Sequence, residues 1–545
     1  MNKTIHLWEC YRLPGSSRPD EWREVLERCL DADICPYRYD IHNTSLRIWN
    51  PSDTEIAVPD STYTCRNGYE LQRVNFGHQK GETLVGISLA RLVFEPCSKS
   101  PLPYSSNELF SKGKYPEILR HQRMIAGIKP LIEFFNKSLA ERKLEPYNDY
   151  EVSNHTKNII YRFGNRSESL NEILHGAGLS KHLLSAVRNN IAFTSASVRL
   201  GVLSGSVNAS HKGIHIGREI VSVLREWQCQ VSLEDLKDGS NIETFLADSS
   251  CGKPIVLVPL EGRKGDRPPD AAINWLKYLD SEKAAFQIFS TASNPLYSRH
   301  GLAIAILAKA DGSIFITEPT DFPGFHKSWF IGLDLGRGGL NKGRILVITL
   351  ASPDGNLQAY WRARKNDDET LPLKVLQEGL AWITSKADLL DKGRHLYIIR
   401  DGLRPHNESL DFYQISLSKY NFTFIEYSKS GSPLIHCTYS EPEPGTTILP
   451  EGAKFTALYP CISPQHGILT TPIKFRAPIN PNCHSSTNIA LLLTTLCHSA
   501  TLSYQPSRLP APLQWANGLA RLSYKDLQFS GWSHRPSKLI NLADK

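Results

Sequence analysis

Phe330-Ile-Gly-Leu-Asp-Leu-Gly336 reads as an apolar strand that ends in a carboxylate, Asp334, and is followed by further glycines. Arg394-His-Leu-Tyr-Ile-Ile-Arg-Asp-Gly402 repeats this design with Asp401. Two aspartates at strand ends can converge at one edge of a parallel or mixed sheet, and an acidic group from a loop can join them. Clustered carboxylates repel one another unless cations neutralise them, so the pattern favours a site for two divalent metal ions. Mg²⁺ or Mn²⁺ would suit such oxygen ligands.

The residues around these two segments predict an α/β domain. A polar loop, Lys365-Asn-Asp-Asp-Glu-Thr370, separates them and opens a helix at Leu371. Apolar patterning predicts strands at 329–335, 344–350, 357–363, 395–400 and 422–427, and helices at 371–388, 487–498 and 513–523. Three strands, a helix, a strand and a helix is the order of an RNase H-like nuclease core.

The region from Ser197 to Ala308 alternates strands with helices. We expect strands at 198–203, 253–259 and 301–308, and helices at 216–227 and 271–285. Such an order is typical of a small doubly wound, Rossmann-like unit. Ligands of these sheets bind beyond the carboxyl ends of the strands, near helix N-termini that favour anions.

The chain before this region is predicted to contain a β-rich part and then a helical part. Residues 83–90 alternate apolar and small side chains as a half-buried strand does, and residues 45–49 do so more briefly. From Leu119 to Leu144 apolar residues recur at helical spacing, and Pro130 is expected to kink or split this helix. The helix carries a basic face, which is more often a solvated face than a phosphate-binding one.

Length and composition indicate a folded chain of several domains. At about 150 residues per domain, 545 residues suggest three or four domains. Shares of 41% apolar and 21% charged residues are typical of globular proteins, and the apolar runs are too short for a membrane span. Eleven cysteines without metal-site spacing indicate free thiols in a reducing cytoplasm. The net charge of +7 permits a nucleic-acid partner without demanding one.

Four local patterns resemble the prokaryotic Argonaute family, specifically its MID and PIWI domains. Phe330–Gly336 is similar to the first catalytic strand, and Ile398-Ile-Arg-Asp-Gly402 is similar to the family's Arg-Asp-Gly segment. Leu496-Cys-His498, followed by Leu509-Pro-Ala-Pro-Leu-Gln-Trp-Ala-Asn517, resembles the segment whose last position is the fourth catalytic residue. Gly445-Thr-Thr447 and Ser463-Pro-Gln-His-Gly467 lie between these segments in the order that the family shows. Together and in this order the patterns are specific, whereas each alone would be weak.

The resemblance implies a catalytic set of Asp-Glu-Asp plus a variable fourth ligand. Asp334 and Asp401 fit the two aspartates, and Asn517 stands at the fourth position, where aspartate or histidine is commoner. Glu369 lies at the family's usual distance before Asp401 and is the candidate glutamate. Other acids of this stretch are alternatives to it: Asp367, Asp368 and Glu378. The catalytic set would hold two Mg²⁺ or Mn²⁺ ions for phosphodiester hydrolysis.

The resemblance also implies a site for the 5′ end of a guide strand in the doubly wound unit. Lys277, Gln287 and Lys309 fall at the family's phosphate-binding positions, with Lys277 on a helix, Gln287 beyond that helix and Lys309 after the last strand. Ile273 replaces a tyrosine that stacks on the first base in many relatives. The choice between a 5′-phosphate and a 5′-hydroxyl guide therefore stays open.

These inferences divide the chain into four parts. We expect an N-like β-rich domain at 1–110, a helical linker region without a clear PAZ domain at 111–195, a MID domain at 196–328 and a PIWI domain at 329–545. The expected fold class is therefore α/β and multi-domain, with a doubly wound, Rossmann-like MID domain and an RNase H-like PIWI domain.

Three functions are open at this point. The favoured one is a compact Argonaute-like endonuclease that cleaves a target strand paired to a short guide DNA or RNA, in defence against foreign nucleic acid. The second is a guide-dependent binder with little or no cleavage, which is disabled by Asn517 or a misplaced glutamate and acts through an associated effector protein. The third is an RNase H-like nuclease that uses no guide.

Overall fold

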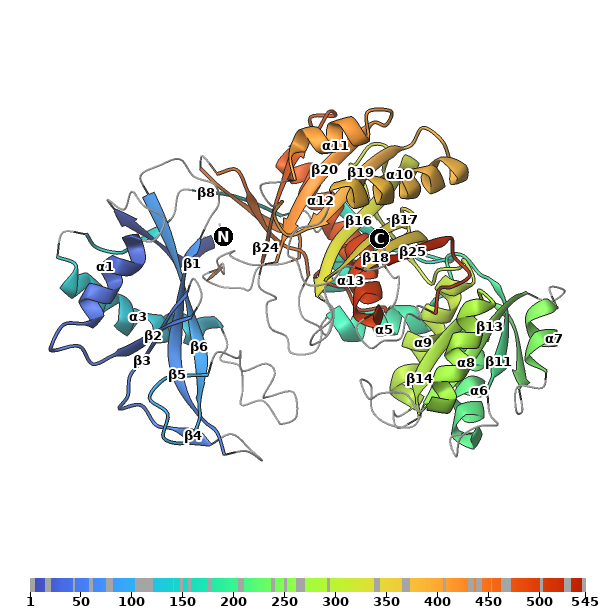
Figure 1. Cartoon of the computed structure of the whole chain (residues 1–545), viewed down its shortest axis with the longest axis horizontal. Helices are drawn as coiled ribbons and strands as arrows, with labels where there is room; N and C mark the ends of the chain where they lie inside the picture. The colour runs from blue at the N-terminus through green and yellow to red at the C-terminus, as the bar shows by residue number, and fades with distance from the viewer. Residues whose placement is uncertain are drawn as a thin grey trace. The chain divides into compact units, whose positions relative to one another are not determined.

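The computed structural model (Figure 1) describes most of the chain. The described residues are 5–14, 21–42, 45–57, 62–74, 82–102, 121–140, 142–147, 150–154, 158–174, 179–203, 210–236, 241–248, 252–260, 270–291, 295–337, 344–364, 373–404, 408–429, 436–437, 444–451, 453–461, 472–499, 503–523 and 531–541. The chain divides into two compact units. Unit 1 comprises Met1–Ser153, Ser428–Tyr459 and Ile468–Phe475, and unit 2 comprises Asn154–Tyr427, Pro460–Gly467 and Arg476–Lys545.

An antiparallel sheet forms most of unit 1. Its strands follow the order β2-β3-β5-β6-β1-β21, with β4 beside β5 and β7 beside β1. Their bounds are β1 Ile5–Pro14, β2 Arg38–His42, β3 Ser45–Trp49, β4 Ile56–Ala57, β5 Thr64–Val74, β6 Glu82–Phe94, β7 Glu145–Tyr147 and β21 His436–Cys437. Helices α1 (Glu21–Leu30) and α3 (His121–Ser138) turn their apolar faces to this sheet, and the three share one core.

A smaller set of strands in unit 1 has the order β23-β22-β8. The bounds are β8 Tyr150–Asn154, β22 Thr446–Pro450 and β23 Thr456–Tyr459, and β23 also pairs with the first residues of β24 (Ile473–Ile479). Apolar side chains of β22 and β23 pack with residues from β5, β6 and β7, so a shared core joins these strands to the larger sheet.

The β-rich character predicted for the start of the chain is confirmed. The predicted strands at 45–49 and 83–90 lie in β3 and β6. The predicted helix is α3, and Pro130 lies inside it as part of one continuous helix, so the chain is not split there. The region predicted to be helical between 111 and 195 also contains strands. Its further elements are β9 Ile159–Arg162, β10 Ser167–Ser169, α4 Leu170–Leu174 and α5 Leu179–Asn189. The four predicted domain boundaries stay a prediction.

One part of unit 2 is a doubly wound unit, as predicted. Four parallel strands lie in the order β12-β11-β13-β14. Their bounds are β11 Ser197–Val202, β12 Gln230–Asp235, β13 Lys253–Leu260 and β14 Ala285–Ser290. Helices α6 (Ser210–Glu226) and α9 (Pro295–Lys309) share a core with one face of the sheet, whereas α7 (Ile242–Ala247) and α8 (Asp270–Ser281) share a core with the other.

The strand predicted at 301–308 is wrong, because these residues belong to helix α9. The run Gly301-Leu-Ala-Ile-Ala-Ile-Leu-Ala308 is apolar on all sides, and such a run does not distinguish a buried strand from a buried helix. Its alanines and leucines favour the helix. The fourth strand of the sheet is instead β14, which begins at Ala285. The helix predicted at 271–285 is α8, and it ends at Ser281, before this strand.

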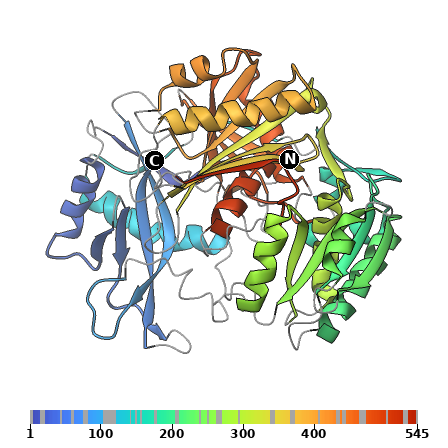
Figure 2. The same cartoon turned by 45° about the vertical axis from the view of Figure 1, so that its right-hand side comes forward.

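The other part of unit 2 has the order of elements predicted for an RNase H-like core. Strand β17 pairs antiparallel with both β16 and β18. On the other side of β16, β19 and then β20 continue the sheet in parallel, and β25 pairs parallel with β18. Helices α10 and α11 share a core with one face, and α13 packs on the other face (Figure 2). The bounds are β16 Ser328–Arg337, β17 Arg344–Ala351, β18 Leu357–Arg364, α10 Leu373–Leu390, β19 His395–Asp401, α11 Leu410–Ser416, β20 Phe422–Ser428, α13 Ala511–Ser523 and β25 Ser537–Asn541.

A three-stranded sheet, β10-β9-β15, connects these two parts of unit 2. Strand β15 (Ile316–Pro319) packs on helix α12 (Ser486–Cys497), where the hydroxyl of Thr317 donates to the carbonyl of Thr495 at 3.0 Å. The hydroxyl of Tyr161 lies 2.5 Å from Nδ1 of His498, and burial lowers the pKa of His498 to about 4. His498 is therefore a neutral residue of the core.

Candidate active site

Two glycines of β16 allow helix α13 to lie directly on the strand. A Cβ atom at Gly332 would collide with the main-chain carbonyl of Pro512, and one at Gly336 would lie 2.6 Å from Cβ of Ala520. The hydroxyl of Thr349 on β17 donates to the same Pro512 carbonyl at 2.7 Å. The start of α13 is thus held at Gly332, and its later turns lie on Gly336.

These two contacts place α13 alongside β16, running in the same direction. They are four residues apart on the strand, or about 13 Å, and eight residues apart on the helix, or about 12 Å. Asp334 lies midway between the two glycines and points to their face, since side chains alternate along a strand. It therefore faces the middle turns of α13, which carry Asn517.

Asp401 lies on the same face of the sheet as Asp334. Leu333 pairs with Arg400 in the parallel ladder of β16 and β19, so the two aspartates follow at equivalent positions on neighbouring strands. Leu333 belongs to the core shared with α10, and the next residue on each strand therefore points toward α13. Neighbouring strands lie about 4.8 Å apart, which places the two carboxylates close enough to share a cation.

The structure thus brings three of the four predicted catalytic residues to one face of the sheet. Asp334 is 6% exposed, and Asp401 and Asn517 are half-buried. The predicted glutamate and two of its alternatives lie outside the described residues: Glu369, Asp367 and Asp368. The catalytic role of all these residues stays a prediction.

The remaining alternative, Glu378, lies on the wrong side of the sheet. It is on α10, which covers the face opposite to α13, and it forms an exposed ion pair with Lys538 at 2.8 Å. Within the part of the chain that the structure describes, no three His, Cys, Asp or Glu side chains come together as a metal site. The donors on the α13 face are two carboxylates and one amide, and such an all-oxygen set fits Mg²⁺ or Mn²⁺.

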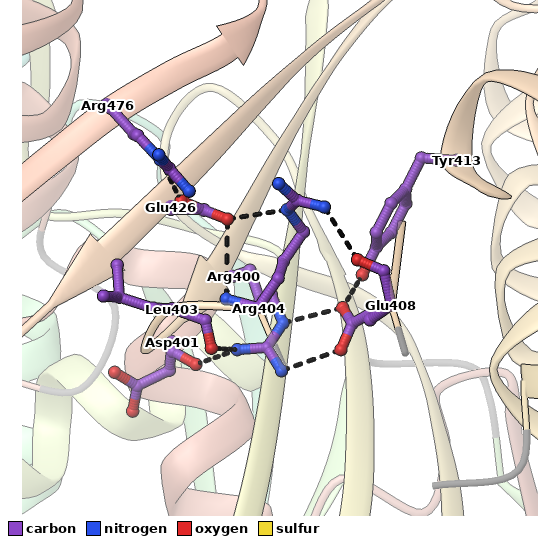
Figure 3. Close-up of polar contacts among 8 residues, drawn as sticks. All are labelled: Arg400, Asp401, Leu403, Arg404, Glu408, Tyr413, Glu426 and Arg476. Carbon is purple, nitrogen blue, oxygen red and sulfur yellow. Dashed lines mark hydrogen bonds and ion pairs between the residues drawn. The ribbon is translucent and has the colours of Figure 1, made fainter. Parts of the chain in front are cut away.

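Arg400 fixes the main chain around Asp401 (Figure 3). Its guanidinium forms two bonds to Glu408, at 2.8 and 2.9 Å, and donates to the carbonyls of Asp401 and Leu403 at 2.9 and 3.0 Å. Tyr413 donates its hydroxyl to Glu408, and burial raises the pKa of Tyr413 well above its usual value, so the hydroxyl stays a donor. Figure 3 shows the Asp401 carboxylate pointing away from this network. The network therefore orients Asp401 through its main chain.

A second buried carboxylate, Glu426 on β20, supports the turn that follows. It is 0% exposed, accepts from Nε of Arg404 at 2.6 Å and forms an ion pair with Arg476. Gly402 has a left-handed φ of 78° and donates its N–H to the carbonyl of Tyr427 at 2.8 Å. The turn is thus held by side-chain and main-chain bonds together.

Sequence reasoning missed Glu408 and Glu426. The available signal was Arg400 itself, because an arginine within an apolar strand requires an acidic partner when it is buried. No spacing rule identifies that partner, since α11 and β20 come beside Arg400 only in the folded sheet.

The predicted guide-binding residues lie in the doubly wound part. Gln287 lies in β14, beyond α8, as predicted, whereas Lys309 is the last residue of α9 and does not follow a strand, because residues 301–308 are helical. Lys309 is 3% exposed, and its Nζ donates to Oε1 of Gln287 at 2.6 Å. Burial lowers the pKa of Lys309 to about 7. Lys277 is on α8, as predicted, and is exposed, whereas Ile273 is buried in the core of this part.

A segment near the end of the described chain covers Lys309. Trp532 forms an isolated β-bridge with Ala285, and its ring centroid lies 5.2 Å from Nζ of Lys309. Arg535 forms an ion pair with Asp311, which directly follows α9 and Ala310. No sequence signal could have linked Trp532 to a lysine so far earlier in the chain, because the contact depends on how the two parts of unit 2 pack.

Comparison with known proteins identifies the fold. No family model matches the sequence, and no curated protein matches it. The solved structure of Marinitoga piezophila Argonaute in complex with a 5′-hydroxyl guide RNA and target DNA matches with a TM-score of 0.63, at 13% identity, over 94% of this chain and 86% of that one. The chain has an Argonaute-like fold.

Two further structures with the Argonaute fold match as widely. Kluyveromyces polysporus Argonaute with a guide RNA gives a TM-score of 0.66 at 10% identity, over 92% of this chain and 77% of that one. Clostridium butyricum Argonaute with a guide DNA and a 19-mer target DNA gives 0.60 at 13% identity, over 94% and 86%. The resemblance noted in the sequence is therefore confirmed at the level of the fold.

Among the residues described, no helix combines the length and the apolar character that crossing a membrane requires.

Proposed function

We propose that the chain is a nucleic-acid-guided endonuclease that cleaves a target strand paired to a short guide DNA or RNA. The observation that carries the proposal is the position of Asp334 and Asp401 on neighbouring strands, on the face that carries α13 and Asn517. The fold supports it, because Argonautes with this fold have been solved with guide and target strands. Defence against foreign DNA or RNA is the proposed biological role.

Each candidate residue has its own proposed role in binding the metal ions. Two Mg²⁺ or Mn²⁺ ions would activate a water molecule for in-line attack and stabilise the leaving 3′ oxygen. Asp334 would hold both ions, and Asp401 and Asn517 would hold one each. Glu369 would complete the set. Asn517 offers a neutral oxygen, so this set attracts cations less strongly than one with a fourth carboxylate.

The doubly wound part would hold the 5′ end of the guide. Lys309 and Gln287 already form one hydrogen-bonded pair, and Lys277 would add an exposed positive charge. Because Lys309 is buried and has a lowered pKa, it can act as a neutral donor to a 5′-hydroxyl group or as a cation to a 5′-phosphate. Both kinds of guide end are therefore compatible with the site.

The neutral Asn517 favours a second candidate function. In this alternative the chain is a guide-dependent binder that cleaves slowly or not at all and acts through a partner effector protein. Replacement of Asn517 by aspartate separates the two, because a stronger cation site should then raise a cleavage rate that the asparagine limits.

A guided cleavage assay tests the proposal. The protein is incubated with a short guide and a labelled complementary target, in Mn²⁺ or Mg²⁺. We expect cleavage at a single position opposite the guide. Retention of intact target by wild type and by Asn517→Asp would favour the binder, and cutting that needs no guide would contradict both. Sequencing of oligonucleotides that copurify with the protein identifies guide and target as DNA or RNA.

Binding of a 5′-phosphorylated guide is expected to weaken as the pH rises from 7 to 9. Lys309 is increasingly neutral above its pKa of about 7, so the phosphate must bind a lysine that first takes up a proton. The affinity should fall by up to about tenfold per pH unit, whereas a 5′-hydroxyl guide should show little change. Equilibrium binding with the two labelled guides measures the difference.

Lys309→Met and Lys277→Ala provide the matched pair of variants for this titration. The first should remove the pH dependence, and the second, which removes an exposed charge, should keep it. A pH dependence that is the same for both guides, or that survives in Lys309→Met, would show that Lys309 does not contact the guide end.

A further inference from the structure

Arg508 lies in the segment that leads into α13, and its main chain is fixed beside the candidate acids. Tyr427 on β20 is buried and donates its hydroxyl to the carbonyl of Arg508. Tyr427 pairs with Asp401 in the parallel ladder of β19 and β20, so the two side chains point to the same face of the sheet. The main chain of Arg508 therefore lies on the face of the sheet that carries Asp401 and Asp334.

The segment around Arg508 is held at both ends. The N–H of Ser507 donates to the carbonyl of Cys497 at the end of α12, at 2.8 Å. The N–H of Leu509 donates to the hydroxyl of Ser507 at 3.0 Å, and the N–H of Gln514 donates to the carbonyl of Pro510 at 2.9 Å. The main chain of Arg508 is thus positioned by its neighbours, independently of its own guanidinium.

The guanidinium of Arg508 lies within electrostatic range of Asp401. Burial lowers the pKa of Arg508, and Tyr427, Cys461 and the Asp401 carboxylate act in the opposite direction. An arginine stays charged under such conditions, because its intrinsic pKa is far above neutral. Arg508 is half-buried, so part of the residue is accessible to solvent.

Three other arginines that the structure describes near Asp401 do not have this position. Arg400 and Arg404 are bound by Glu408 and Glu426, and these bonds lie on the face opposite to α13. Arg362 on β18 shares the α13 face with Asp334, but it is buried and lies beyond β17. Among these four described arginines, Arg508 is the one whose main chain is tied to Tyr427, the strand neighbour of Asp401.

We propose that Arg508 is a phosphate-binding residue of the candidate site, and that its guanidinium binds the non-bridging oxygens of the target phosphodiester next to Asp401. The proposal rests on the function proposed above. A phosphodiester carries a negative charge and would be repelled by Asp334 and Asp401, so a cation at their edge lowers the cost of approach. The planar guanidinium can donate two parallel hydrogen bonds to two phosphate oxygens, which also orients the group.

A scan with uncharged linkages tests this proposal without metal and without cleavage. Guide-loaded protein is mixed, in EDTA, with targets in which one phosphodiester at a time is replaced by a methylphosphonate. For the wild type we expect one linkage at which the replacement weakens target binding by about tenfold. Arg508→Ala should bind the natural target about tenfold more weakly and show no further loss at that linkage, as expected when both changes remove the same contact.

Two variants complete the experiment. Arg508→Lys keeps the charge, so the methylphosphonate at that linkage should still weaken target binding in part. This variant also provides the test if Arg508→Ala does not fold. Lys419→Ala removes an exposed charge from the α11 side and should keep the full penalty. The proposal is overturned if the loss of target binding at each linkage is the same in the wild type and in both Arg508 variants. Absence of guide-dependent target binding in the wild type would instead overturn the proposed function.

Discussion

Replacing Asp334 with alanine is expected to abolish target cleavage while guide-dependent target binding persists. Asp334 points from β16 toward α13 and has Asp401 as its neighbour on β19, so its removal takes away the carboxylate that both cations would share. We expect the rate to fall by about a thousandfold or more, which corresponds to about 4 kcal/mol of lost transition-state stabilisation. The single-turnover rate on a labelled target at saturating Mn²⁺ measures it.

Asp401→Asn and Glu378→Gln are the informative companions to this variant. Asp401→Asn keeps the size of the side chain and should lose cleavage as severely, because it leaves one carboxylate on the α13 face. Glu378→Gln also removes one acidic charge, but from α10 on the opposite face, and should cleave as the wild type does. Normal cleavage by Asp334→Ala, with intact folding, would move the active site away from this face and refute the assignment.

The strands that carry these aspartates could be predicted from the sequence for a physical reason. Each is a run of apolar residues long enough to cross a buried sheet, followed by a carboxylate. Strand β19 ends at its aspartate, as predicted, whereas β16 continues past Asp334 to Arg337. The register that brings Leu333 beside Arg400 could not be read from either run alone. Nor could the sequence show that Gly332 and Gly336 serve the approach of α13, since that contact joins residues far apart in the chain.

The errors have a common cause, which is that burial overrides local pattern. Residues 301–308 are apolar on every side because α9 is enclosed, and periodicity carries no information in such a run. The lowered pKa of Lys309 was equally invisible, since it depends on burial that includes the contact with Trp532. Glu408 and Glu426 read as ordinary surface acids until the segment before α11 and strand β20 place them against arginines.

Glu426→Ala is expected to destabilise the protein strongly. The Glu426 carboxylate is 0% exposed and binds two arginines, Arg404 at 2.6 Å and Arg476. Removing it leaves these charges in the protein interior without their common acid, and breaking such a buried pair typically costs about 3–5 kcal/mol. We expect a loss of this size in the free energy of unfolding, measured by urea denaturation of the whole chain.

An exposed acid of the same fold shows whether burial is the cause. Glu378→Ala breaks an ion pair of similar length, 2.8 Å to Lys538, but Glu378 is 38% exposed, so the expected loss is at most about 1 kcal/mol. Because Arg404 also holds the turn after Asp401, Glu426→Ala should reduce cleavage in protein that remains folded, whereas Glu378→Ala should not. Equal losses of stability in the two variants would mean that the buried arginines relax to solvent, and that the turn after Asp401 does not depend on Glu426.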